Sequence, residues 1–357
     1  MHLLRVTCHD FRCLQEIDFQ PEPGVNAIRG DNAQGKTSVL EAILFVTTSK
    51  SHRTVQEAEL ARHDAEGFRL QAWARRKDRD VTLEANWWKG AKRIKVNGVA
   101  QTRVSDVLGK VNTVFFSPED VMLIKGGASF RRRFLDMALS QVDGVYLNAL
   151  QRYRQSLRQR NELLRAAKPD ADQLDAFEAQ LEQSGNLLRE RRAEFAARLG
   201  QFAAAKYHAI AQDESFDIAY EPNIPLGESI AELLARHRLV DIKRKTTLRG
   251  PHRDDLRFLI AGQPARNYAS QGQQKTAALS AKLAELELVR ERVGEYPVLM
   301  LDEVLAELDE ARTRRLFEAI DDAVQCIVTT TVRSPQTQAL GAQWPSYRVE
   351  RGHLEKE

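Results

Sequence analysis

The residues with the clearest chemical capacity form one short segment, GDNAQGKT at positions 30–37. It fits the pattern G-x-x-x-x-G-K-[ST], in which glycines let a loop wrap around phosphates and backbone N–H groups face them at the start of a helix. In this pattern Lys36 reaches the β- and γ-phosphates, and the Thr37 hydroxyl binds Mg²⁺. The segment predicts a nucleotide-binding loop made of Gly30, Asp31, Asn32, Ala33, Gln34, Gly35, Lys36 and Thr37.

Two carboxylates late in the chain indicate which reaction the nucleotide-binding loop supports. Asp302 and Glu303 follow an apolar run at 298–301, which predicts a buried strand that ends in two carboxylates. Beside Thr37, Asp302 is expected to hold Mg²⁺ through water, and Glu303 is placed to polarise a water for in-line attack on the γ-phosphate. The sequence thus predicts nucleotide hydrolysis, with Glu303 and Lys36 as catalytic residues and Thr37 and Asp302 as metal ligands.

Between these two sets lies the segment ASQGQQK at 269–275, directly before a predicted helix. It resembles the LSGGQ-type signature of ABC ATPases, in which a serine hydroxyl and a glycine backbone bind the γ-phosphate held by a second subunit. The resemblance implies this role for Ser270 and Gly272, at a helix N-terminus suited to an anion. The alternative interpretation is a polar helix cap.

The elements that must position the loop are predicted within the first 116 residues. An apolar run at 25–28 precedes the loop, and apolar residues at helical spacing over 39–44 follow it, as a strand–loop–helix unit requires. Gly, Asp and Pro signals separate the other candidate strands, and Asn97-Gly98 predicts a tight hairpin turn. The candidate strands of this region are 3–8, 14–19, 24–28, 68–74, 81–87, 93–96 and 111–116.

Residues 131–207 have a helical pattern with almost no Gly or Pro. The pattern breaks at 168–170, and Asp170 with Gln173 resembles a capping box that restarts it. Heptad spacing on both sides of the break predicts two helices packed as an antiparallel arm, although an ordinary helical subdomain without a function of its own is equally consistent. The heptad positions are Leu150, Leu157 and Leu164 before the break, and Leu174, Leu181, Leu188, Phe195 and Phe202 after it.

Alternating strands and helices return after a Pro-containing link near 221–227. This alternation, following the antiparallel beginning, predicts a mixed sheet. We therefore expect an α/β fold in which a P-loop head with a mixed sheet carries an α-helical antiparallel arm. The expected domains are residues 1–116, 117–207 and 208–357, with late strands at 256–260, 298–301 and 326–330 and late helices at 276–290 and 310–320.

Composition and charge limit the class of protein. A hydrophobic content of 43% and a charged content of 29% are ordinary for a soluble protein, and the longest apolar runs are too short to span a membrane or to act as a secretory signal. Cys8, Cys13 and Cys326 lack metal-ligand spacing, so reduced thiols in a cytoplasmic protein are expected. The net charge of +3 is only mildly basic. Local clusters of Lys and Arg are nevertheless consistent with binding to the phosphate backbone of a nucleic acid. These clusters are 75–77, 131–133, 189–192 and 243–245.

Together these motifs resemble the RecF family of bacterial recombination mediators, which are relatives of SMC-type ABC ATPases without long coiled coils. The resemblance extends over essentially the whole chain, and GPHRDD at 250–255 is its most specific segment. The other segments that carry it are DFR at 10–12, GDNAQGKTSVLEAI at 30–43, FSPED at 116–120, RRRFLD at 131–136, SQGQ at 270–273 and DE at 302–303.

The resemblance implies an SMC-type ABC-ATPase head that binds ATP and Mg²⁺ and dimerises on ATP. It implies binding to gapped DNA and single-strand/duplex junctions, and help from RecR and RecO in loading RecA during DNA repair and replication restart. Slow ATP hydrolysis would release the dimer. By the same resemblance Arg12 contacts phosphate, and Arg53 is a weaker candidate for nucleotide or DNA contact.

Two positions depart from the wider ABC pattern. Glu119 or Asp120 stands where other members carry a glutamine that links the nucleotide to domain movement. Thr329-Thr330-Thr331 stands where transporters carry a γ-phosphate-sensing histidine. Both departures favour slow, switch-like hydrolysis over vigorous turnover.

Two other functions stay open at this point. One is a P-loop enzyme that acts covalently on nucleic acid or on a small acceptor, as an ATP-dependent nuclease or a kinase. His252 beside Asp254 and Asp255 is the nearest candidate for such a site. The other is a purely structural ATP-binding scaffold, which the intact Asp302-Glu303 pair opposes.

Overall fold

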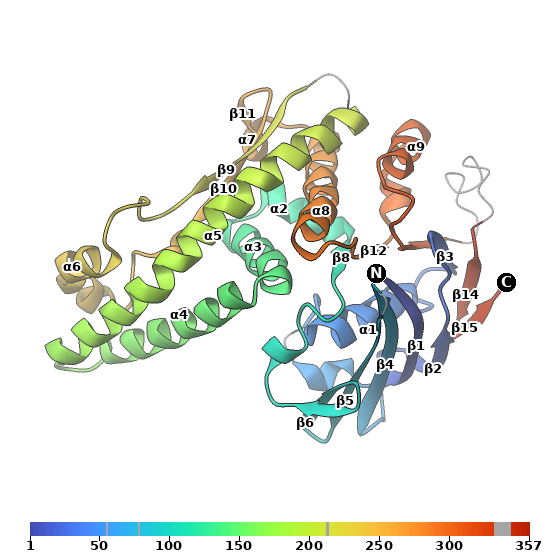
Figure 1. The fold of residues 1–357 in the computed structure, drawn as a ribbon, viewed down its shortest axis with the longest axis horizontal. Coiled ribbons are helices and arrows are strands. Elements are labelled where there is room, and N and C mark those ends of the chain that lie inside the picture. The colour runs from blue at the N-terminus through green and yellow to red at the C-terminus, as the bar shows by residue number, and fades with distance from the viewer. Residues whose placement is uncertain (55, 78, 212–213, 332–343) are drawn as a thin grey trace. The chain divides into compact units, whose positions relative to one another are not determined.

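The computed structural model describes residues 1–357 except 55, 78, 212–213 and 332–343, and the chain forms two compact units (Figure 1). Unit 1 comprises Met1–Asp120, Lys206–Asp213 and Leu279–Glu357. Unit 2 comprises Val121–Ala205 and Glu214–Ala278. Residues 208–357, expected as one domain, are therefore divided between the two units.

Unit 1 contains a mostly parallel six-stranded sheet in the order β15-β14-β3-β13-β12-β8. β3, β13, β12 and β8 pair in parallel, and all four residues of β12 are buried, which is typical of a strand covered on both faces. The antiparallel β14–β15 hairpin makes the sheet mixed, as expected. The strands are β3 (Val25–Arg29), β8 (Thr113–Phe116), β12 (Val298–Leu301), β13 (Cys326–Thr330), β14 (Ser346–Glu350) and β15 (His353–Lys356).

A second, antiparallel sheet of unit 1 has the order β2-β1-β4-β5-β6-β7. Its strands alternate buried and exposed side chains, so one face packs on the core. Asn97 and Gly98 both have positive φ, at 50° and 78°, between β6 and β7, which confirms the predicted tight turn. The strands are β1 (His2–Phe11), β2 (Leu14–Phe19), β4 (Gly67–Arg76), β5 (Arg79–Trp88), β6 (Ala91–Val96) and β7 (Val99–Gln101).

Helix α1 (Lys36–Thr48) follows the P-loop and is buried along most of its length. It packs against strands of both sheets, and its apolar side chains join Phe11, Phe68 and Ile327 in one core cluster. The continuous burial of this helix holds the loop at its N-terminus in a fixed position. The other helical segments of unit 1 are η1 (Glu57–Leu60), η2 (Val104–Asp106), η5 (Val304–Glu307), α9 (Glu310–Glu318), the end of α5 and most of α8.

Unit 2 is built around the antiparallel helices α4 (Gly144–Leu163) and α5 (Ala171–Ala211). The predicted restart is confirmed, because the Asp170 carboxylate accepts a hydrogen bond from the Gln173 N–H at 2.9 Å. Pairs such as Ser156–Gln180 and Tyr146–Arg192 fix the antiparallel register. The predicted arm is present.

The heptad seam is only partly correct. In α5, Leu174, Leu181, Leu188 and Phe195 are buried as predicted, but Phe202 is only partly buried. In α4, the predicted Leu157 is likewise only partly buried. The buried stripe has the three-to-four spacing of a globular helix because α4 also contacts α3 (Ala128–Val142). Its members are Tyr146, Leu147, Ala149, Leu150, Tyr153, Ser156 and Arg160.

A three-stranded sheet, β11-β10-β9, completes unit 2 and explains why residues 214–278 belong to it. β10 packs on α3, and β9 approaches α5 so closely that a Cβ at Gly200 would lie 3.2 Å from the Ile218 carbonyl oxygen. The remaining elements are η3 (Pro118–Val121, at the junction), α2 (Met122–Lys125), β9 (Phe216–Glu221), α6 (Ile230–Arg244), η4 (Pro251–Arg253), β10 (Asp255–Ile260), β11 (Gln263–Pro264), α7 (Ala265–Tyr268) and the start of α8 (Gln271–Val293).

Two sequence expectations concern the whole chain. Cys8, Cys13 and Cys326 are free thiols, in agreement with the absence of disulfides expected from their number and spacing. Within the part of the chain that the structure describes, none of the helices is apolar over the length that a bilayer crossing needs.

Candidate functional site

The P-loop joins β3 to α1 in a conformation that glycine makes possible. Gly35 has φ 115°, and a Cβ there would meet the Cys13 Sγ at 3.0 Å. At Gly30 a Cβ would lie 2.5 Å from the Val349 carbonyl oxygen, so β14 leaves no space for a side chain. The two glycines of the motif are therefore required by backbone shape and by close packing.

Lys36 is buried at the start of α1, and its Nζ donates to the carbonyl oxygens of Gly30 at 2.9 Å and Asp31 at 3.0 Å. The same Nζ lies 3.3 Å from the Glu303 carboxylate. The loop thus folds around its own lysine and keeps the ammonium group at the centre of a ring of oxygen atoms. Phosphate oxygens would be equivalent partners for this cation.

Asp302 connects the end of β12 to β13 and to the start of α1. Its Oδ1 accepts hydrogen bonds from Thr37 at 3.0 Å and from Thr329 at 2.8 Å. Burial raises the pKa of the Asp302 carboxyl, and the two hydroxyl donors offset only part of this effect. A divalent cation bound here would favour the ionised form, so the oxygen set of Thr37 and Asp302 fits Mg²⁺.

Thr329 is a site residue that the sequence analysis missed. The sequence indicates only that it stands where transporters carry a histidine, yet its hydroxyl donates to Asp302 and accepts from the Glu303 N–H at 2.9 Å. β13 lies between β3 and β12. Thr329, near the carboxyl end of β13, therefore lies between the P-loop and Asp302. A threonine at the end of a buried strand that is central in the sheet is the signal that identifies it.

A cavity of about 1000 Å³ opens beside the P-loop within unit 1. This volume is at the upper end of the range for small-molecule sites. The cavity brings together most of the predicted ligands with residues that were not predicted, among them the basic residues Arg62 and His63. Its lining includes Arg12, Asn32, Ala33, Gly35, Lys36, Thr37, Arg53 and Glu303.

The remaining residues of the predicted loop have other contacts. Gly30 and Asp31 offer their carbonyl oxygens to Lys36. Gln34 accepts hydrogen bonds from the backbone of Arg351 and Gly352, at the turn between β14 and β15. These three residues shape and anchor the loop in this structure, and the roles predicted for them toward a nucleotide stay predictions.

Ser270 and Gly272 belong to unit 2, at the start of α8, whereas the P-loop belongs to unit 1. The Ser270 Oγ accepts from the Gln273 N–H at 3.3 Å, and the Gln273 Oε1 accepts from the Ser270 N–H at 2.7 Å. This reciprocal pair is a capping box, so the polar-cap interpretation is correct for this single chain. Ser270 is exposed, and the role implied for it toward a second subunit stays a prediction.

Asp120 and Glu119 differ in their surroundings. Burial raises the pKa of the Asp120 carboxyl, which accepts a hydrogen bond from the Ser117 N–H at 2.8 Å. Glu119 is exposed, and it follows β8, next to the strand that ends in Asp302. Of the two candidates for the usual glutamine position, Glu119 is therefore the one whose side chain is accessible.

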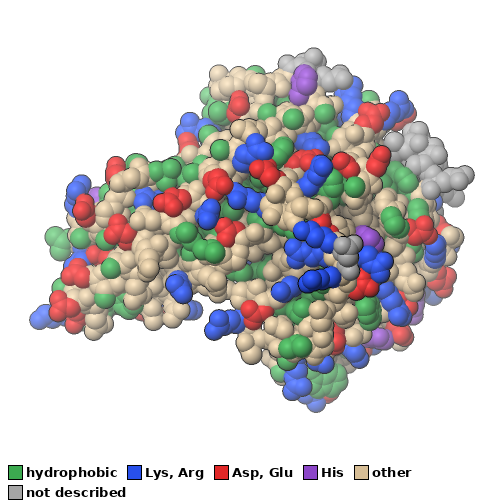
Figure 2. All heavy atoms as spheres, viewed as in Figure 1, with side chains coloured by type: hydrophobic (Ala, Val, Ile, Leu, Met, Phe, Trp, Pro, Cys, Tyr) green, Lys and Arg blue, Asp and Glu red, His purple; other side chains and the backbone are tan. Residues whose placement is uncertain are grey.

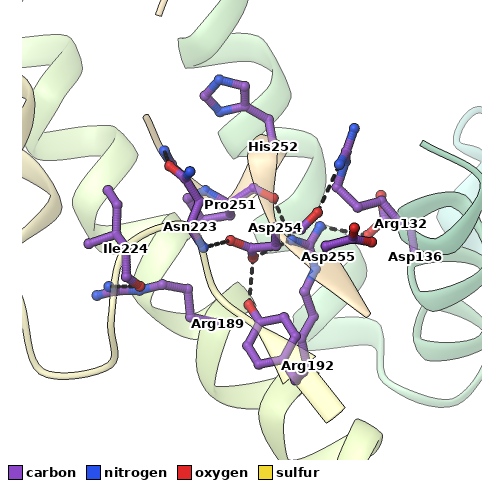
Figure 3. Close-up of polar contacts among 12 residues, drawn as sticks. Arg132, Asp136, Arg189, Arg192, Asn223, Ile224, Pro251, His252, Asp254 and Asp255 are labelled. Atoms are coloured by element: carbon purple, nitrogen blue, oxygen red, sulfur yellow. Dashed lines mark hydrogen bonds and ion pairs between the residues drawn. The ribbon is translucent and has the colours of Figure 1, made fainter. Parts of the chain in front are cut away.

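The segment GPHRDD at 250–255 lies in a buried polar network of unit 2 (Figure 3). The Arg192 guanidinium donates to Asp254 and to Asp136, both at 2.8 Å, and joins η4 to α3 and α5. Arg131 forms a two-pronged pair with Asp255, at 2.6 and 2.8 Å. The carboxylates of Asp254 and Asp255 thus hold elements of unit 2 together.

His252 belongs to the same structural set. Its ring nitrogens contact the Tyr153 hydroxyl at 2.7 Å and the Thr247 carbonyl oxygen at 3.0 Å. Burial lowers the pKa of His252 to about 4. His252, Asp254 and Asp255 thus form internal contacts, and they do not provide the acid–base set that a covalent nuclease or kinase would need.

Comparisons with known proteins agree with this arrangement. The sequence model of the RecF/RecN/SMC N terminal domain family matches residues 2–352. A protein of Halalkalibacterium halodurans named DNA replication and repair protein RecF is 42% identical over 370 residues, with full coverage of both chains. The chain belongs to the RecF family.

Solved structures support the family and the fold. A structure of the recombination mediator protein RecF with ATP, in the RecFOR pathway, has a TM-score of 0.91 and 32% identity, covering 100% of this chain and 97% of that one. An Smc head bound to the C-terminal winged-helix domain of ScpA has a TM-score of 0.61 at 16% identity over 100% of this chain and 97% of that one. The expected SMC-type ABC-ATPase fold is confirmed.

We predict that His252 makes unit 2 sensitive to acid. The folded state favours the neutral ring, while the unfolded chain takes up a proton below pH 6.5, so stability present above pH 6.5 is lost as the pH falls toward 4. The loss amounts to roughly 3 kcal/mol for a shift of this size. Hydrogen exchange of α4 and α5 amides should show this loss of stability at low pH in the wild type and not in His252→Gln. An equal acid sensitivity of both proteins would contradict this assignment, and His208→Gln, on exposed α5 surface, serves as the control.

We predict that Thr329→Val weakens the metal site. The substitution removes one of the two donors to buried Asp302, a loss of about 1–3 kcal/mol. The Mg²⁺ concentration for half-maximal ATP turnover should rise by about tenfold or more. Thr330→Val, at the adjacent buried position of β13, is the matched control. Equal effects of the two substitutions would contradict a specific role for Thr329.

Proposed function

We propose that this protein is an ATP-dependent, DNA-binding recombination mediator. The observation that carries the proposal is the cluster of Lys36, Thr37, Asp302 and Glu303 in a chain that matches RecF proteins over its full length. The mediator would act on gapped DNA and single-strand/duplex junctions in the cytoplasm. With RecR and RecO as partners, it would help load RecA during DNA repair and replication restart.

Each residue of the site has its own role in the proposed mechanism. P-loop N–H groups and Lys36 bind the phosphates of ATP, while Thr37 and Asp302 hold Mg²⁺, which supplies positive charge to the phosphate oxygens. Lys36 and Glu303 are paired at 3.3 Å in this structure. When Lys36 donates to phosphate instead, Glu303 becomes available to accept a proton from the attacking water.

Slow turnover is consistent with this geometry. The Glu303 side chain is 43% exposed, and its carboxylate is paired with Lys36 at 3.3 Å. A base that must first leave an ion pair is suited to a switch, in which the ATP-bound state persists before hydrolysis releases it. We propose weak ATPase activity of this kind.

The switch would act through a homodimer. Each P-loop would receive Ser270 and Gly272 from the other subunit, whose helix N-terminus favours an anion. The exposure of Ser270 and Gln271 supports this role, because a second subunit could reach the start of α8. ATP would thus join two copies of the chain.

We predict that Ser270→Arg abolishes ATP-dependent dimerisation. A bulky cation at the helix start would block the approach of a second subunit's phosphate. Sedimentation velocity with and without ATP measures the result, and Ala167→Arg, an exposed substitution at the tip of the arm, is the control. Glu303→Gln should prolong the dimer by slowing hydrolysis. Dimers of Ser270→Arg that form at the wild-type ATP concentration would contradict the proposal.

DNA contact is proposed to be electrostatic and independent of base sequence. Figure 2 shows Lys and Arg side chains interspersed with Asp and Glu on the visible face of each unit. Backbone recognition needs only the cations, since the phosphates carry no sequence information.

We predict that binding to a gapped duplex is strongest with ATP and falls steeply with salt. Between 50 and 200 mM salt the affinity should decrease by roughly a hundredfold if about four phosphates are neutralised. Fluorescence anisotropy with ATP, with ADP and without nucleotide measures this, and a second duplex of shuffled sequence controls for base recognition. A flat salt response would contradict recognition of the backbone.

A further inference from the structure

Glu41 is a fully buried carboxylate on α1, one turn after Thr37, to which neither the motif nor the proposed mechanism assigns a role. It does not line the cavity beside the P-loop. A buried charge is costly unless it is paired and hydrogen-bonded. Its partners therefore indicate what the residue does.

The first partner is Arg12, at the turn between β1 and β2. Its Nε and one terminal nitrogen donate to the two Glu41 oxygens at 3.0 and 2.8 Å. The other terminal nitrogen donates to the Glu59 carbonyl oxygen at 2.9 Å. Arg12 also has a positive φ of 55°, so both its backbone and its side chain are held in one arrangement. Arg12 lines the cavity.

The second partner is Arg53, which follows α1 and also lines the cavity. Its guanidinium lies 3.8 Å from the Glu41 carboxylate. Ser51 donates to the same carboxylate at 2.5 Å, and its Oγ accepts from the backbone N–H groups of Arg53 and Thr54. Glu41 thus fixes both the side chain of Arg53 and the segment that carries it.

The carboxylate is ionised in this setting. Burial by itself would raise the pKa of Glu41, but the hydrogen bonds from Arg12 and Ser51 outweigh it and leave the pKa below its usual value. A negative charge behind the cavity wall therefore faces two positive charges in the wall. Each terminal nitrogen of Arg12 carries a second N–H, and the Arg53 side chain is 48% exposed, so both guanidinium groups can still donate to a ligand.

We propose that Glu41 is a positioning residue that holds Arg12 and Arg53 as a pair of phosphate-binding guanidinium groups in the cavity that Lys36 also lines. The inference rests on the proposed function, because it takes the phosphates of ATP as the ligand. Preorganised donors bind an anion more tightly than donors that must be ordered on binding. Glu41 would thus act on ATP binding without touching ATP.

Electrostatics alone predicts the opposite effect. If Glu41 only reduced the positive charge of the cavity, then Glu41→Gln would bind ATP more tightly than the wild type. If it positions Arg12, Glu41→Gln should raise KM for ATP by about tenfold and leave kcat within about twofold, because Lys36, Thr37 and Glu303 are unchanged. The sign of the change distinguishes the two accounts.

A double-mutant cycle tests the connection to Arg12. The ATP affinities of wild type, Glu41→Gln, Arg12→Gln and the double variant are measured by calorimetry. Because Glu41 acts on ATP through Arg12 and Arg53, the loss of ATP affinity in the double variant should be smaller than the product of the two single-variant losses. Fully multiplicative losses of ATP affinity would overturn the proposal. An ATP affinity of Glu41→Gln equal to or higher than that of the wild type would overturn it as well.

Arg12→Lys keeps the test decisive if Glu41→Gln does not fold. Lysine retains the charge at this partly exposed position but cannot form the two-pronged pair with Glu41. ATP affinity should fall about as far as in Arg12→Gln, and wild-type affinity would overturn the proposal. Glu295→Gln, which breaks another ion pair of unit 1, is the control and should bind ATP normally. A wild-type protein that does not bind ATP would instead refute the proposed function, and this inference with it.

Discussion

The candidate site depends on the parallel pairing of β3, β13 and β12. Because parallel strands present their carboxyl ends at one edge of a sheet, the P-loop, Thr329 and Asp302 meet there. The buried Asp302 carboxylate accepts hydrogen bonds from the Thr329 hydroxyl in β13 and from the Thr37 hydroxyl in α1, which follows β3 through the P-loop. Any shift of register would leave this carboxylate buried without its donors, at a cost of several kcal/mol. The chemistry of the site and the pairing of the sheet therefore stabilise the same arrangement.

Unit 2 depends on buried ion pairs of a different kind. Arg192 joins Asp254 to Asp136, while Arg160 joins Glu178 to Asp241 deep in the arm. Breaking one partner of such a pair leaves an uncompensated buried charge, typically at a cost of about 3–5 kcal/mol. The segment GPHRDD, which carries much of the family resemblance expected from the sequence, is part of this network. Its carboxylates hold the elements of unit 2 together.

Local patterns predicted most elements correctly. Apolar runs bounded by Gly and Pro located the strands, and Asn97-Gly98 located a turn whose positive φ values only such residues adopt easily. The heptad pattern was less reliable, because a seam assumes one packing partner. Helix α4 also packs on α3, so its buried stripe turns toward that contact and leaves Leu157 only partly buried. The division into units could not be predicted either, since β9 and β10 reach the helices only through long-range packing.

The sequence by itself determined the loop chemistry, because backbone shape, Lys36 and Thr37 are encoded within eight consecutive residues. It also determined the carboxylates at the end of β12 and, through its motifs, the family. Only the tertiary structure decided which residues support them. Thr329 lies 292 positions after Thr37, and the two meet Asp302 through strand order. Glu41 and Arg12 likewise meet because α1 packs against the β1–β2 turn, and no local pattern in a single chain encodes such a contact.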